Sequence, residues 1–309
     1  MQNVLKRIAG LFLGFALTVG VAQAEELKPF ILAYTDNGDM AAVVADVREK
    51  LTGAGFEIVG SYQPYDDGSA TVIGVTNDTL KQEAARTEFG GYGVVQRVTV
   101  TDMDGQLQVA YTHPTYMAHA YRMAGDLAGV TAQLEGALGR EQQYGPDEGM
   151  SPDDLREYHY MFGMEYFDDP SELAEYDSYE AGIEAVEASL AKGTAGVTKV
   201  YRVDIPGKDQ TVFGVAMDAP SEDDQYMDDE YIMSEIDFKD LRSTGHLPYE
   251  ILVSGDESYA LYARFRIAIN FPDLSMMGSH SFMNIMDSPG AIEKALIQAA
   301  GGELTAEHW

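Results

Sequence analysis

The chain has 309 residues and no cysteine, which excludes disulfides, thiolate metal ligands and cysteine nucleophiles. Basic residues are also scarce: 20 Lys and Arg stand against 51 Asp and Glu, and the formal net charge is −31. A charge of this size repels nucleic acids and anionic membrane surfaces, so neither is expected as a partner. The stability of the fold must come from the packing of a hydrophobic core.

Long hydrophobic runs are almost absent as well. The one such run, residues 8–21, is 14 residues long and therefore shorter than the ~20 residues that a membrane-spanning helix needs. Lys6 and Arg7 precede it, and residues 22–24 (AQA) have the small side chains that signal peptidase recognises. This pattern predicts a signal peptide at residues 1–24 and an exported protein that is soluble once the peptide is removed. In a Gram-negative bacterium its location would be the periplasm.

A weak internal repeat organises the remaining chain. The stretch "TVIGVTND" at residues 71–78 resembles "TVFGVAMD" at residues 211–218. An amphipathic helix and a strand that ends in proline are predicted before each copy. Asp39 and Ser178 are suited to cap these helices. The predicted buried stripes are Met40, Val43, Val44, Val47 and Leu51 in the first helix and Tyr179, Ile183, Val186 and Leu190 in the second.

The parallel continues after each copy of the repeat. Two alternating strands turn around residues 104–105 in the first half and around residues 255–256 in the second. A closing helix is predicted after each hairpin, at residues 127–138 and 289–300. The sequence therefore predicts an α+β fold made of two tandem units, each with the order strand, helix, four strands, helix.

The two units differ between their third and fourth strands. In the first unit, Thr79 and Gln82 have the spacing of a capping box, which predicts a short helix. The second unit has an acidic insert, "SEDDQYMDDE", at residues 221–230 before its own short helix. Carboxylates suit calcium, but the insert does not complete a twelve-residue calcium loop. A solvated acidic loop with weak calcium affinity is expected.

Residues 141–177 separate the first unit (25–140) from the second (178–309). This segment is rich in acids, proline and glycine, yet it has many aromatic side chains that are unfavourable in water. We expect it to pack across both units and to hold them together. The aromatic residues concerned are Tyr158, Tyr160, Phe162, Tyr166 and Phe167.

The order of elements, the blocks "IVGSYQP…TVIGVTND" and "KVYRVDIP…TVFGVAMD", and the hairpins that end in "THP" and "NFP" resemble the bacterial family called domain of unknown function 302, here as a tandem pair. The resemblance implies curved antiparallel sheets, each gripped by its last helix, similar to the TATA-binding-protein-like class of α+β folds. It implies no activity, because the family offers no catalytic residues to place on this chain.

Methionine and histidine are concentrated near the C-terminus. If residues 276–286 are helical, Met276, His280, Met283 and Met286 share one face. Thioether and imidazole groups suit copper(I), so this set is a candidate metal site. Alternatively, the methionines fill an irregular gap in the core. Two similar clusters are Met117, His119 and Met123, and His159, Met161 and Met164.

A pair of arginines forms a second candidate site. The alternation in "YALYARFRIAIN" predicts a strand with Arg264 and Arg266 on one face. Two neighbouring guanidinium groups could bind a carboxylate or phosphate. The alternative is that they pair with acids of the chain itself.

Catalytic motifs are not recognisable in this sequence. His246 lies three residues from Tyr249 and His113 lies at a strand end, but neither has a nucleophile in a known arrangement. We therefore expect a non-catalytic binding protein. Its partner would be a small apolar or amphipathic ligand in a cleft beneath a closing helix, or a protein on the side of residues 141–177. Copper(I) handling is the alternative, and an enzyme of unrecognised type comes after it. No bound cofactor is predicted apart from that possible copper.

Overall fold

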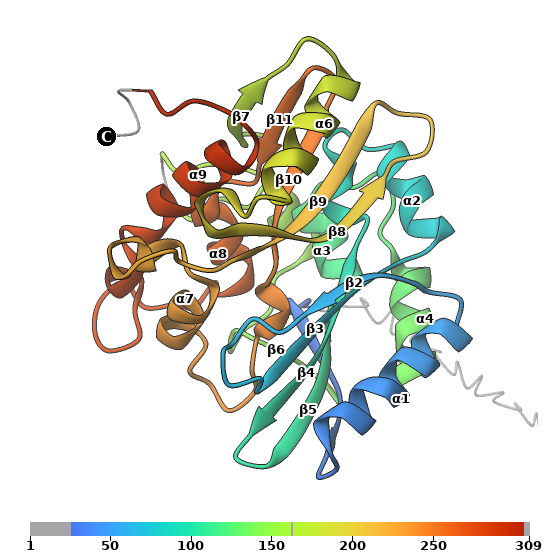
Figure 1. Cartoon of the computed structure of the whole chain (residues 1–309). Helices are drawn as coiled ribbons and strands as arrows, with labels where there is room; N and C mark the ends of the chain where they lie inside the picture. Colours follow the sequence, from blue (N-terminus) through green and yellow to red (C-terminus); the bar gives the residue numbers. More distant parts are fainter. Residues whose placement is uncertain (1–25, 162, 306–309) are drawn as a thin grey trace, which may run out of the picture.

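The computed structural model describes residues 26–161 and 163–305. The predicted signal peptide at residues 1–24 lies outside them. Two open, curved antiparallel sheets form the framework, which confirms the α+β prediction (Figure 1). The first sheet contains β1 (Phe30–Asp36), β2 (Glu57–Tyr62), β3 (Ala70–Thr76), β4 (Gln96–Met103), β5 (Gln106–Thr112) and β6 (Gln142–Tyr144). The second contains β7 (Ser171–Glu175), β8 (Val197–Asp204), β9 (Gln210–Met217), β10 (Tyr249–Ser254) and β11 (Glu257–Ala260).

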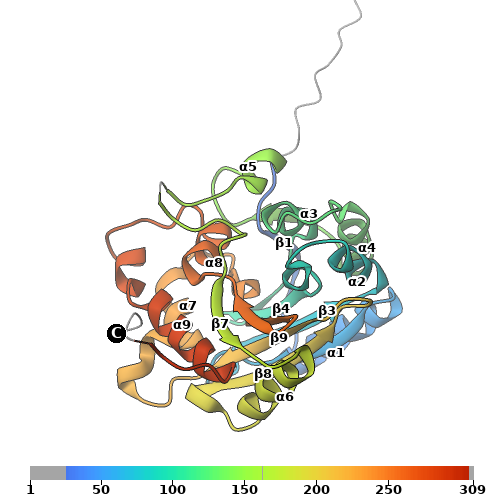
Figure 2. The same ribbon diagram turned by 90° about the horizontal axis from the view of Figure 1, so that it is seen from above.

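Helices cover the sheets of both units, and α1 and α4 lie together beside the first sheet while α6 and α9 lie together beside the second (Figures 1 and 2). The α-helices are α1 (Met40–Gly53), α2 (Asp78–Ala85), α3 (Pro114–Ala120), α4 (Ala128–Leu138), α5 (Pro152–Arg156), α6 (Tyr179–Leu190), α7 (Asp229–Ile236), α8 (Ala263–Asn270) and α9 (Ser288–Ala299). Short 3-10 helices are η1 (Gly90–Gly93), η2 (Thr194–Gly196), η3 (Glu222–Met227), η4 (Thr244–His246) and η5 (Phe282–Ile285).

The two sheets have the same topology. The strand order is β2-β3-β4-β5-β1 in the first sheet, with β6 added beyond β1, and β8-β9-β10-β11-β7 in the second. The second strand of each unit, β2 or β8, has a register shift at the same place. The shift comes just before the residue that pairs with the glycine of the repeated sequence. Gly60 faces Gly74 in the first unit, and Tyr201 faces Gly214 in the second. The repeat seen in the sequence is therefore a repeat of structure.

The helix starts follow local hydrogen-bonding chemistry. Asp39 accepts from the backbone N–H of Ala42, and Ser178 accepts from that of Ala181, so both predicted caps are confirmed. The short helix α2 also exists. The predicted capping box at Thr79 is wrong, because the cap is Asn77, whose side chain accepts from the N–H of Leu80.

Residues 141–177, called the bridge from here on, contribute to both units. β6 pairs with β1 at the edge of the first sheet, and β7 pairs with β11 at the edge of the second. Phe167 is buried, stacks on Tyr121 with ring centroids 5.6 Å apart, and lies 6.2 Å from Phe265. The bridge thus packs against both units, as expected from its aromatic content. Phe162 lies outside the described residues.

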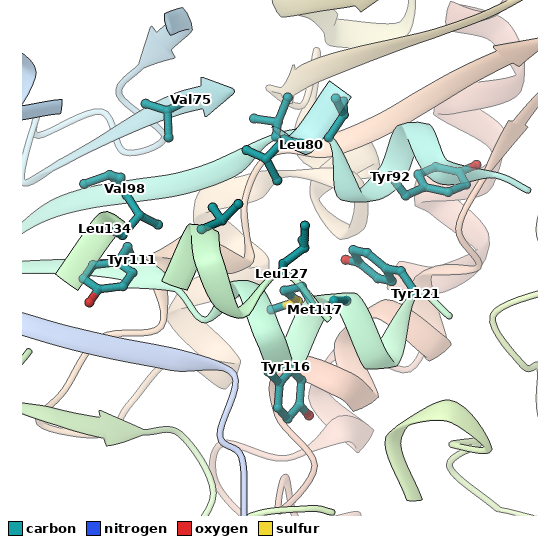
Figure 3. Close-up of a cluster of buried hydrophobic side chains, with 14 of the residues drawn as sticks. Val75, Leu80, Tyr92, Val98, Tyr111, Tyr116, Met117, Tyr121, Leu127 and Leu134 are labelled. Atoms are coloured by element: carbon teal, nitrogen blue, oxygen red, sulfur yellow. The ribbon is translucent and has the colours of Figure 1, made fainter. Parts of the chain in front are cut away.

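The first unit has a continuous core in which strands β3, β4 and β5 supply valine and tyrosine and the covering helices supply leucine (Figure 3). The same cluster includes side chains of the second unit, among them Tyr201, Leu252 and Phe265. A core shared in this way is expected to make the two units unfold together.

Three glycines, two from the first unit and one from the second, leave room for Tyr201 and the adjoining backbone of β8. A Cβ on Gly214 would lie 2.2 Å from Cζ of Tyr201, and a Cβ on Gly74 would lie 3.0 Å from Cδ1 of the same ring. A Cβ on Gly60 would lie 2.2 Å from the carbonyl oxygen of Val200. The repeated glycines therefore leave room for one tyrosine of β8 where β2 and β8 meet.

A buried charge cluster also joins the units. Nη2 of Arg97 in β4 lies 2.6 Å from Oε2 of Glu250 in β10, and Nη1 of Arg266 in α8 lies 3.4 Å from the same oxygen. Tyr201 donates its hydroxyl hydrogen to Oε1 of Glu250 at 2.7 Å. The three charged side chains are at most 2% exposed, so this carboxylate serves two buried guanidinium groups at once.

Two sequence-based predictions of local structure are wrong. The predicted strand at residues 259–270 ends at Ala260, and Ala263–Asn270 form the helix α8. Almost every side chain of α8 is buried, so the apolar residues do not form a stripe on one face and show no helical period in the sequence. The helix considered conditionally at residues 276–286 is an irregular loop with one 3-10 turn, because Gly278 and His280 have φ values of 123° and 57°.

Candidate functional site

The predicted methionine site lies on the surface loop 271–287, not on a helix. Met276, Met283 and Met286 are 43%, 51% and 60% exposed, so the alternative that they fill the core is also wrong. The loop closes on itself, because the N–H of Met283 donates to the carbonyl oxygen of Met276 at 3.2 Å. His280 stacks on Phe238 at 5.0 Å. Met276 and Met283 are thus brought together by loop closure, and the metal site remains a prediction.

An apolar groove lies where this loop meets α8 and the bridge, with a volume of about 50 Å³. We call it the methionine groove. It is lined by Tyr160, Met161, Met164, Arg264, Ile267, Ala268, Phe271, Leu274, Met276 and Phe282. Two of the methionine clusters seen in the sequence, one in the bridge and one in the loop, therefore meet at one place.

Exposed apolar side chains of the described residues gather around this groove. The large hydrophobic residues with high exposure are Met161, Phe238, Met276, Met277, Met283 and Met286. Met161 and Met276 line the groove, three more belong to the loop that forms its wall, and Phe238 contacts that loop through His280. Apolar side chains gathered in this way mark interaction surfaces more often than scattered ones do.

The predicted arginine pair is separated by the helix. Arg264 lies at the edge of the groove, where its Nη2 is 2.5 Å from Oε1 of Glu165, and its guanidinium is 4.8 Å from the ring of Tyr262. Arg266 points into the core, where it pairs with Glu250 and donates to the carbonyl oxygens of His246 and Pro248. The expected common strand face does not exist, because two residues along a helix differ in direction by about 200°.

The other methionine and histidine residues have structural surroundings. Met117 and Met123 are buried in the core of the first unit. Nδ1 of His119 accepts from Nε of Arg156 at 3.2 Å, and burial together with this charge lowers the pKa of His119. His159 packs on Tyr166 with ring centroids 4.4 Å apart. These contacts account for the positions of the four side chains, and none of the contacts requires a bound ligand.

The acid-base candidates are also part of the core. His246 is fully buried, and its Nε2 lies 3.0 Å from the hydroxyl oxygen of Tyr249. Burial and the charges of Arg266 and Arg97 hold the pKa of His246 well below its usual range, so this imidazole is neutral. Nδ1 of His113 lies 3.0 Å from the carbonyl oxygen of Lys28.

Metal coordination by the usual side chains has no preformed centre in the structure. Within residues 26–161 and 163–305, no group of three or more His, Cys, Asp or Glu side chains could hold a metal ion. The acidic insert instead forms η3 and the start of α7. Its carboxylates border a separate pocket between the units.

Several groove residues could not be identified from the sequence. Phe271, Leu274 and Phe282 lie in a loop, where apolar residues have no periodicity that reveals their direction. Gly278, which follows Pro272 and Ser275 and directly precedes Ser279, was the available sign that residues 276–286 break the helical pattern.

Comparisons with known proteins give no relative for this chain: no family model, curated protein or solved structure matches it. Throughout the described part of the chain, helices are too short or too polar to cross a bilayer.

Proposed function

We propose that this chain is a non-catalytic binding protein and that its methionine groove receives an apolar side chain from a basic segment of a partner protein. The observation that carries the proposal is the gathering of the exposed large hydrophobic residues on the groove and its loop. The first unit has no counterpart of this surface among its described residues.

The size of the groove favours a protein segment over a free small molecule. A cavity that binds benzene has a volume of about 150 Å³, whereas the groove has about 50 Å³. This volume suits the end of one side chain, such as leucine or methionine, while the rest of the partner lies on the surrounding surface. Methionine suits such a surface because its unbranched thioether adapts to different shapes.

The charge of the chain selects a basic partner. The net charge is −31, and the loop that carries the methionines is flanked by Asp273 and Asp287. Asp273 is neutralised by Lys239, so the remaining local charge comes from the exposed Asp287 and from Glu235, which accepts from the neutral side chain of Asn284. A partner with Lys or Arg beside its apolar anchor would be attracted to this surface, and the attraction would weaken with added salt.

Export is part of the same proposal. The predicted signal peptide at residues 1–24 would deliver the protein to the periplasm, and the binding surface would meet its partner there. The absence of cysteine from the chain is compatible with an oxidising compartment.

The binding experiment uses two short synthetic helical peptides with the same leucine face. One carries lysine and the other carries glutamate on its polar face. Fluorescence anisotropy should detect binding of the lysine peptide alone. The double variant Met161→Gln and Met276→Gln should weaken this binding about tenfold or more, because both anchors of the groove become polar.

Met40→Gln is the matched control, because Met40 is a partly buried methionine at the start of α1 in the first unit. It should bind the lysine peptide as the original protein does. Equal binding of the double variant, or equal binding of the glutamate peptide, would contradict the proposed docking surface.

Copper(I) binding is a second candidate, because three thioethers of the predicted clusters, Met161, Met164 and Met276, line the same groove. Replacing all three by leucine separates the two functions. Leucine keeps the groove apolar, so peptide binding should persist, whereas copper(I) measured by competition with a chromogenic chelator should no longer bind in stoichiometric amount. Unchanged copper binding in this variant would exclude the groove as a copper site.

A further inference from the structure

A second cavity lies between the two units, on the side of α7, and has a volume of about 390 Å³. From the first unit, the end of β2 and the following turn contribute Tyr62, Gln63, Pro64 and Asp66. The second unit contributes the end of β9 and the start of α7, with Ala216, Met217, Asp218, Asp228, Asp229, Glu230 and Tyr231. Cavities of this size are in the range of small-molecule sites.

The cavity is strongly acidic. Five of its lining residues carry carboxylates, and none of the described lining residues is Lys or Arg. No ion pair in the described part of the chain involves any of these five acids, which are Asp66, Asp218, Asp228, Asp229 and Glu230. In a chain with few basic residues, this charge is available to a cation from outside.

Some of the acids also have structural contacts. Asp228 caps α7: its Oδ1 accepts from the N–H of Tyr231, and its Oδ2 accepts from the N–H of Ala219. Glu230 accepts from the N–H of Asp66 at 2.8 Å, which joins the two units at the edge of the cavity. The positive end of α7 is therefore already satisfied by Asp228.

Asp229 is different, because its carboxyl group is only partly satisfied. The residue is 2% exposed. Its Oδ2 accepts from the hydroxyl of Tyr62 at 3.1 Å and from the N–H of Met217 at 3.2 Å. Its Oδ1 is buried and has no hydrogen-bond partner among the described residues. A buried carboxylate oxygen without a partner is unfavourable. Because Asp229 lines the cavity, a small rotation of its side chain would bring this oxygen to a donor that enters there.

The arrangement of the acids indicates the chemical class of the ligand. The carboxylates surround the cavity, and no three of them converge closely enough to hold a metal ion. Separate carboxylates match a molecule that carries several separate ammonium groups. The rings of Tyr62 and Tyr231 and the side chain of Met217 provide apolar wall between them, which suits methylene segments and attracts cations.

We propose that the cavity between the units binds a linear diamine or polyamine, with one ammonium group donating to Oδ1 of Asp229 and the others paired with the carboxylates around the cavity. This site is separate from the methionine groove, and neither proposal depends on the other.

Isothermal titration calorimetry with spermidine tests the proposal on the full mature chain at physiological ionic strength and at pH 8, above the raised pKa of Asp229, so that this carboxyl group is ionised. Saturable binding of one spermidine per protein is expected. Asp229→Asn should weaken it about 30-fold or more, because an uncharged amide replaces the buried counter-ion. Asparagine can still accept from Tyr62 and Met217, so the fold is retained, and circular dichroism of the variant verifies this.

Asp223→Asn is the matched control, because it removes the same charge from an exposed position in the acidic insert, outside the cavity lining. It should leave the dissociation constant within about twofold. An equal loss in both variants would show a diffuse charge effect and overturn the proposal. No saturable binding of spermidine, or displacement of spermidine by calcium at equal concentration, would overturn it as well.

Discussion

Replacing Glu250 by glutamine should destabilise the whole protein, because this carboxylate neutralises two buried guanidinium groups. Oε2 of Glu250 lies 2.6 Å from Arg97 and 3.4 Å from Arg266, and each of the three side chains is at most 2% exposed. Removing one partner of a buried ion pair costs about 3–5 kcal/mol, since the remaining charge stays buried. The glutamine side chain has a similar shape and can still accept from Tyr201, so the expected loss arises from charge and not from a cavity.

A loss of this size is a large part of the ~5–15 kcal/mol that stabilises an ordinary folded protein. Urea unfolding followed by far-ultraviolet circular dichroism measures it as a shift of the midpoint. Because the two units also share a hydrophobic core, the variant should still unfold in one transition. The matched control is Asp46→Asn, which breaks an exposed pair with Lys50 and should cost less than about 1 kcal/mol. A Glu250→Gln variant as stable as this control, or two separate transitions, would refute the reasoning.

Two further predictions concern stability. Burial raises the pKa of Asp229 from 3.8 to about 7. Between these two pH values the folded protein holds a proton on Asp229 that the unfolded chain has released, so the free energy of unfolding falls as pH rises from about 4 to about 7. Asp229→Asn should therefore stabilise the protein by up to about 4 kcal/mol above pH 7 and leave its stability nearly unchanged near pH 4. Urea unfolding at several pH values, without added amine, measures this difference. An equal effect at both pH values would contradict the reasoning. Gly60→Ala should lower the midpoint of thermal unfolding, because the added Cβ would lie 2.2 Å from the carbonyl oxygen of Val200. Gly136→Ala, in open space on α4, should raise the midpoint by the equivalent of about 1 kcal/mol. The opposite order of midpoints would be inconsistent with the packing of β2 on β8.

Local patterns predicted the architecture where one side of an element is buried and the other is solvated. The stripes of α1 and α6 are of this kind, and Asp39 and Ser178 mark their starts. The repeat "TVIGVTND" and "TVFGVAMD" identified the equivalent strands β3 and β9. The resemblance to domain of unknown function 302 remains a prediction, and so does the signal peptide.

The same patterns failed where burial is uniform or where a loop has no period. Residues 263–270 are buried on nearly all sides, so alternating apolar residues suggested a strand although the chain forms α8. Spacing alone also suggested a helix at residues 276–286, whereas Gly278 and His280 turn the chain back on itself.

Asp229 was missed within a run of acids, although the sequence contained a sign. Asp229, Ile232, Met233 and Ile236 lie at helical spacing on the buried side of α7. An acid on an apolar stripe is more informative than an acid in a charged run, because burial of a carboxylate needs a compensating partner.

Hydrogen–deuterium exchange in the presence of the lysine peptide tests most directly whether the methionine groove is a binding surface. Protection is expected in the loop at residues 271–286 and in the bridge at residues 158–161, with no change in α1. Protection confined to other segments, or no protection at a saturating peptide concentration, would contradict the proposed function.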